Sequence, residues 1–161
     1  MSSLKVTRPQ EEIQTLKKFF ENQGIKFDSE LAIQDKSLRE PCDASYQGIE
    51  YQITYGNRKM LGDMRKANSI RSKENPDIGG PYCKIGGSPN YAQEILETAL
   101  ESKKNKSDKN MTLLIDPYPR LGFPFSGDSL LKEYFKENEE RLGGLWQQIF
   151  VVFSGENIQL R

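Results

Sequence analysis

Apolar residues near the start of the chain recur at helical spacing. Thr7 and Gln10 have the spacing of a capping box, Pro9 falls in the first turn, and 22–24 (Asn-Gln-Gly) interrupts the pattern. A first helix is therefore predicted between Thr7 and Asn22, and its apolar stripe consists of Ile13, Leu16, Phe19 and Phe20.

Two stretches that follow alternate between apolar and polar positions. Residues 25–34 carry apolar side chains at odd positions, interrupted near Asp28, and this alternation predicts a strand. Residues 43–46 and 49–54 flank Gln47-Gly48, which predicts a β-hairpin because glycine supplies the positive φ of a tight turn. In its second strand, Glu50, Gln52 and Thr54 would then share one face.

The second half of the chain alternates helical patterns with short apolar runs. Residues 57–73 have an amphipathic helical pattern, whereas 74–90 are rich in Pro, Gly, Asp and Asn and predict a loop. The remaining pattern predicts a helix from Ser88-Pro89 to about Lys104, a buried strand at 111–115, a helix at 130–142 capped by Asp128 or Ser129, a buried strand at 148–153 and a final strand at 158–160.

This order of elements predicts the α/β class, with helices on each side of a mixed sheet. We expect residues 1–161 to form one domain, since the chain has the length of a single domain and no linker. The longest apolar runs are far shorter than the roughly 20 residues that cross a bilayer, and the start of the chain has no apolar signal region. A cytoplasmic protein is therefore expected.

Composition narrows the chemistry that such a chain can perform. It contains no histidine, which excludes Ser-His-Asp and Cys-His catalysis and histidine-bearing zinc sites. Its two cysteines stand far apart, which argues against a Cys-x-x-Cys metal or redox pair. Lys plus Arg equals Asp plus Glu at 23 each, so total charge does not indicate nucleic-acid binding. Carboxylates, lysine, tyrosine or a hard metal must therefore carry any chemistry.

The hairpin brings two carboxylates together. A two-residue turn pairs Tyr46 with Ile49 and Ser45 with Glu50, and places Asp43 opposite Gln52. Asp43 and Glu50 are then diagonal neighbours, about 7–8 Å apart at the backbone. Close carboxylates repel unless a proton or cation lies between them, and Mg²⁺ prefers such oxygen ligands. The same alternation also fits an ordinary half-exposed hairpin.

Pro41-Cys42-Asp43 followed by Glu50-Tyr51-Gln52 resembles the PD-(D/E)xK nuclease superfamily. The resemblance implies a restriction-endonuclease-like fold and a DNA endonuclease that depends on Mg²⁺ or Mn²⁺. Asp43 and Glu50 match its two acids and would bind the metal, and Gln52 occupies the position of its lysine, which orients water. Glu12 or Glu11 matches the acid that the preceding helix contributes in this superfamily, and we expect Glu12 to be the one that joins the catalytic residues. The implied partner is DNA, bound by a homodimer or within a larger defence or repair complex.

A basic segment follows the hairpin directly. Between 56 and 73 there are one acid and six basic residues, namely Arg58, Lys59, Arg65, Lys66, Arg71 and Lys73. Lys59, Lys66 and Lys73 are spaced by seven, as are Arg58 and Arg65. We expect Arg58, Lys59, Arg65 and Lys66 to contact DNA phosphates, although a solvated helix face has the same pattern. Two other functions stay open: a non-catalytic nucleic-acid- or protein-binding module that retains the nuclease fold, and an unrelated α/β protein of assembly or regulation.

Overall fold

A mixed sheet organises the computed structural model, which describes residues 7–35, 37–38, 40–55, 91–117, 128–153 and 155–161. Within these ranges five strands lie in sequence order: β1 (Ala44–Tyr46), β2 (Ile49–Tyr55), β3 (Met111–Asp116), β4 (Gln148–Phe153) and β5 (Glu156–Gln159). The three central strands are parallel, and each outer strand is antiparallel to its neighbour. The described chain is therefore α/β, as predicted.

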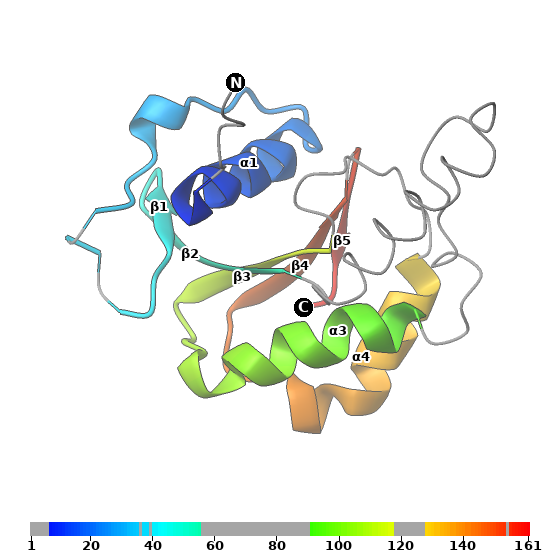
Figure 1. Ribbon diagram of the computed structural model, residues 1–161. Helices are drawn as coiled ribbons and strands as arrows, with labels where there is room; N and C mark the ends of the chain where they lie inside the picture. Colours follow the sequence, from blue (N-terminus) through cyan, green and yellow to red (C-terminus); the bar gives the residue numbers. More distant parts are fainter. Residues whose placement is uncertain (1–6, 36, 39, 56–90, 118–127, 154) are drawn as a thin grey trace, which may run out of the picture.

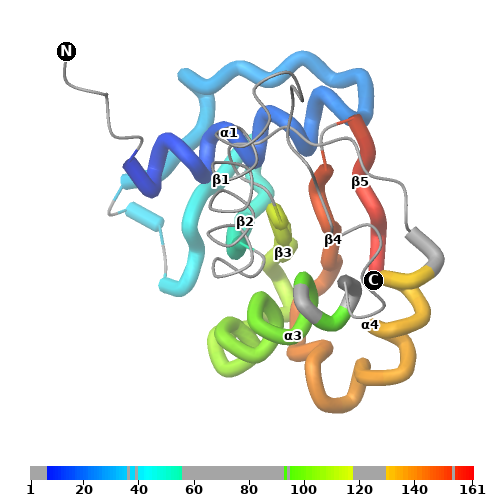
Figure 2. The backbone as a smooth tube through the Cα atoms, turned by 45° about the vertical axis from the view of Figure 1, so that its right-hand side comes forward, coloured from blue at the N-terminus to red at the C-terminus, as the bar shows by residue number. Residues whose placement is uncertain are grey.

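Helices cover both faces of this sheet (Figures 1 and 2). Helix α1 (Arg8–Glu21) packs on one face, where its aromatic residues meet Tyr51, Ile53 and Leu114. Helices α3 (Tyr91–Lys103) and α4 (Asp128–Leu142) pack on the other, over Leu113, Ile115 and the inner side chains of β4. Because side chains alternate along a strand, β2 presents its odd positions to α1 and its even positions to α3.

The first helix forms as the sequence predicts. The Thr7 side chain accepts a hydrogen bond from the Gln10 backbone, and the Gln10 side chain accepts one from the Thr7 backbone. The apolar stripe buries Leu16, Phe19 and Phe20, and both phenylalanine rings pack edge-on against Tyr51 of the hairpin. Glu11 and Glu12, in the first two turns, are buried as well. Burial of a carboxylate is costly unless the group is paired or protonated.

The hairpin register is also confirmed. Tyr46 pairs with Ile49 and Ser45 with Glu50, and both turn residues have positive φ, 51° at Gln47 and 80° at Gly48. Two positive φ values define the turn whose twist suits a hairpin.

The strand predicted at 25–34 is wrong except for one residue pair. Only Ile33 pairs with Ser45, and Ser29–Leu31 form a short 3-10 helix (η1). The Asp28 side chain accepts the backbone N–H of Glu30, and such local capping competes with strand formation. Ile25 and Ile33 are each 44% exposed, so the alternation provides no buried face to hold a strand.

Two boundaries shift, and one prediction cannot be compared. Helix α4 begins at Asp128, so Asp128 and Ser129 lie inside it, and β5 begins at Glu156 rather than at residue 158. The amphipathic segment 57–73 lies outside the described residues. No described helix is long and apolar enough to cross a membrane.

Candidate functional site

Asp43 lies at the edge of the sheet, one residue before β1. Its backbone N–H donates to the Tyr51 carbonyl (2.9 Å), and its Oδ2 accepts the backbone N–H of Ile53 (2.8 Å). The N–H of a strand residue points along the sheet toward the neighbouring strand, where it ordinarily meets a backbone carbonyl. For the Ile53 N–H, the carboxylate of Asp43 takes the place of that carbonyl. Asp43 is therefore within reach of side chains from both layers.

Glu12 approaches this edge from α1. Only 6% of this residue is exposed, and among the described residues its Oε2 has no hydrogen-bond partner. Burial, and next the charge of Asp43, raise the pKa of Glu12 from 4.5 to about 7. A buried carboxylate oxygen without a partner is uncommon and needs an explanation. A cation between Glu12 and Asp43 would supply one.

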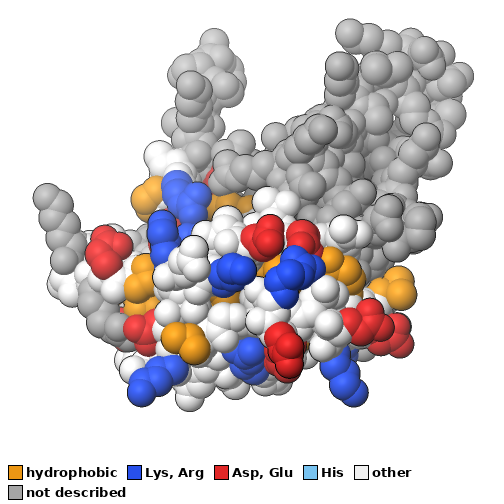
Figure 3. Space-filling view, turned by 90° about the horizontal axis from the view of Figure 1, so that it is seen from below, with side chains coloured by type: hydrophobic (Ala, Val, Ile, Leu, Met, Phe, Trp, Pro, Cys, Tyr) orange, Lys and Arg blue, Asp and Glu red, His pale blue; other side chains and the backbone are white. Residues whose placement is uncertain are grey.

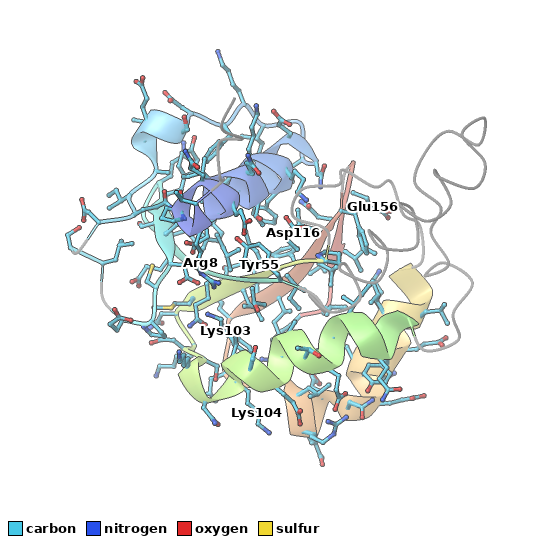
Figure 4. The ribbon with its side chains drawn as sticks, viewed as in Figure 1. Arg8, Tyr55, Lys103, Lys104, Asp116 and Glu156 are labelled. Carbon is cyan, nitrogen blue, oxygen red and sulfur yellow. The ribbon has the colours of Figure 1, made fainter. Side chains whose placement is uncertain are left out.

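Two basic residues flank the carboxylates. Lys103, in the last turn of α3, places Nζ 3.9 Å from Asp43 Oδ2 with only 16% of its side chain exposed. Arg8 lies over the Tyr55 ring, 5.5 Å from its centre, and Figure 4 shows Arg8, Tyr55 and Lys103 between α1 and the C-terminal end of α3. Both cations lower the pKa of Glu12 against the larger effect of burial. The tyrosine is itself buried, and burial followed by the charges of Glu11 and Glu12 raises its pKa.

Glu50 and Asp43 both act electrostatically on Cys42. Burial raises the pKa of the Cys42 thiol, and the charges of Glu50 and Asp43 add to this rise. A pocket of about 520 Å³ opens here, and acidic side chains form much of its lining, which consists of Gln34, Asp35, Leu38, Glu40, Cys42 and Asp43. Asp43 lines this pocket, whereas Glu12 and Glu50 are not among its lining residues.

Gln52 has a different environment from the one expected of a water-orienting group. It is fully buried, its Oε1 accepts the indole N–H of Trp146, and its Nε2 donates to the carbonyls of Pro41 (3.2 Å) and Lys106 (3.0 Å). Both amide hydrogens are therefore taken up by backbone groups. The side chain ties β2 to the segment before β1, the turn before β3 and the segment before β4.

The donor set suits a divalent cation that retains water. In the described part of the chain, no group of three or more Cys, Asp or Glu side chains is placed to hold a metal. Magnesium commonly takes one or two protein carboxylates and completes its octahedron with waters or substrate oxygens. Glu12 with its unpartnered Oε2, together with Asp43, fits that requirement. The four expected DNA contacts, Arg58, Lys59, Arg65 and Lys66, lie outside the described residues.

A second buried carboxylate has partners of its own. Asp116 ends β3, is fully buried, accepts the Thr15 hydroxyl (2.8 Å) and pairs with Lys18 Nζ (2.8 Å). These contacts anchor α1 to the centre of the sheet and hold Glu12, one turn away, against its edge. Sequence reasoning identified neither this anchor nor Lys103, because their partners lie far away along the chain.

Stability should depend on pH through Glu12. A carboxyl group whose folded pKa is raised stabilises the fold when protonated, and this contribution, complete below pH about 4.5, is lost as pH rises toward 7. As the pH rises from 4 to 8, we expect the free energy of unfolding of Glu12→Gln to increase by about 2 kcal/mol relative to that of wild type, after allowance for solvent screening. Urea denaturation with chelator present measures the difference. The matched control is E21Q, which removes an exposed carboxylate of the same helix, and parallel pH curves for wild type and E12Q would contradict the prediction.

Comparisons of the chain with protein-family models, with curated proteins and with solved structures found no match.

Proposed function

We propose that this protein is a metal-dependent nuclease that hydrolyses DNA phosphodiesters at the acidic edge of its sheet. The observation that carries the proposal is Glu12, whose buried Oε2 has no hydrogen-bond partner among the described residues and whose pKa is raised by burial and by the charge of Asp43. The order of elements, namely helix, hairpin, helix and then a strand parallel to the hairpin, also supports a restriction-endonuclease-like core.

Each residue of the edge has a role in this proposal. Glu12 and Asp43 offer oxygen ligands to Mg²⁺ or Mn²⁺, and Glu50 adds negative charge that acts on neighbouring Cys42. The bound ion supplies positive charge for the phosphodiester and lowers the pKa of a coordinated water. Arg8 and Lys103 limit the repulsion within the acidic group, since both lower the pKa of Glu12. Gln52 fixes the segment that carries Asp43, through the Pro41 carbonyl.

One observation favours a second function. Gln52 occupies the position of the superfamily's lysine, and its amide hydrogens are engaged by backbone carbonyls. A chain in which this position serves packing alone would suit a nucleic-acid- or protein-binding module that retains the fold without cleaving.

Cleavage assays separate the two functions. Purified protein should cut single-stranded, double-stranded or branched DNA with Mg²⁺ or Mn²⁺ and should not cut with chelator. Glu50→Gln keeps the shape of the side chain and removes its charge, so cutting should fall while circular dichroism stays unchanged. DNA binding without cleavage of any of these substrates would favour the module. If the protein neither binds nor cuts DNA, then DNA is excluded as the partner.

A further inference from the structure

We propose that Lys103 supplies the positive charge of this site and, with substrate bound, donates a hydrogen bond to a phosphate oxygen. The inference rests on the proposed function, and it assigns to α3 a role that the resemblance places on β2. The carrying observation is that Lys103 and Glu12 approach the carboxylate of Asp43 from opposite layers of the sheet.

The position of Lys103 is unusual for a lysine. Its side chain is 16% exposed, although a lysine ordinarily keeps its ammonium in water. Its Nζ lies 3.9 Å from Asp43 Oδ2, which is an ion-pair distance but too long for a hydrogen bond. That oxygen already accepts the Ile53 N–H. The ammonium is therefore attracted to the site without being fixed by Asp43, and it can bind an incoming anionic oxygen.

The neighbouring surface does not explain this placement. Seen from below, the described side chains over α3 and α4 include basic and acidic groups interspersed with one another (Figure 3). Lys104, the next residue, points elsewhere, and its Nζ donates to the Arg141 carbonyl at 3.3 Å. Lys103 is thus distinguished from Lys104 by its contact with the acidic edge, which makes Lys104 the matched control.

Neutralising Lys103 should affect metal and substrate in opposite directions. The ammonium repels a cation at Asp43 and competes for Oδ2, so Lys103→Met should bind Mn²⁺ about tenfold more tightly in the absence of DNA. The same variant should lose about 100-fold in kcat with KM changed less than about threefold, because a charge that acts on the transition state has been removed. K104M should match wild type in both measurements, and K103R should recover part of kcat.

Isothermal titration with Mn²⁺ and steady-state cleavage measure these effects in the full chain. Should K103M fail to fold, K103Q provides the neutral variant. If K103M cuts as K104M does, or binds Mn²⁺ with unchanged affinity, the role of Lys103 is overturned. If wild type binds Mn²⁺ but cuts no DNA, the nuclease proposal fails and the Mn²⁺ titration alone judges Lys103: tighter binding in K103M supports its place at the metal, and unchanged binding refutes it. If wild type neither binds Mn²⁺ nor cuts, both proposals fall.

Discussion

Asp43→Asn is expected to abolish metal-dependent cleavage, with a loss of about 1,000-fold or more in kcat. Asparagine keeps the shape of the side chain, and its Oδ1 can still accept the Ile53 N–H. The negative charge that attracts the cation and balances Lys103 is lost, so Mn²⁺ binding should weaken in parallel. Cleavage kinetics and Mn²⁺ titration on the same preparation test both effects.

The control for this variant is Asp35→Asn, which removes an acid from the lining of the same pocket. The Asp35 carboxylate accepts a hydrogen bond from the Ser37 backbone N–H. Asp35 is not among the charges that shift the pKa of Glu12. D35N should cut as wild type does. If D43N also retains wild-type cleavage, the site is not at this edge, and the activity has to be sought elsewhere in the chain.

Gln52→Lys is expected to destabilise the fold by about 3 kcal/mol or more. The resemblance alone favours this change, because it restores the superfamily's lysine. The structure reverses that expectation: the new ammonium would be fully buried, and the Trp146 indole N–H would lose its acceptor. Substitutions that leave a buried charge without a partner, or a buried hydrogen-bond donor without an acceptor, are among the costliest in a protein core.

Urea denaturation of Q52K measures this loss. Gln147→Lys, an exposed change of the same chemistry beside Trp146, should shift the midpoint little. If Q52K is as stable as wild type and cuts DNA faster, then the Gln52 side chain reaches the catalytic site, and its contact with Trp146 is dispensable.

Local signals explain which parts of the fold could be predicted. The capping box at Thr7 and the turn at Gln47-Gly48 act within four residues, so sequence alone places α1 and the hairpin. The alternation at 25–34 failed because a strand also requires a partner and a buried face, and Asp28 offered its backbone a turn instead.

The site depends on contacts that local patterns do not encode. Spacing places Glu50 and Gln52 on the same face of β2, but it cannot reveal that the acceptor of the Trp146 indole, 94 residues away, is the Gln52 amide. The approach of Lys103 to Asp43 likewise depends on where α3 ends over the sheet. In the sequence, Lys103 is one of several lysines in a charged segment, and only the packing of α3 distinguishes it.

The hydrogen bond from Ile53 to Asp43 links ligand occupancy to the integrity of the sheet edge. A single oxygen, Asp43 Oδ2, serves as the acceptor that continues β1 and as the point of attraction for the nearby charge. A ligand that draws this oxygen away leaves the Ile53 N–H without its protein acceptor, and part of the ligand's binding energy is then consumed in loosening the hairpin. Affinity at the edge is therefore set jointly by the chemistry of the ligand and by how readily the first strand can fray.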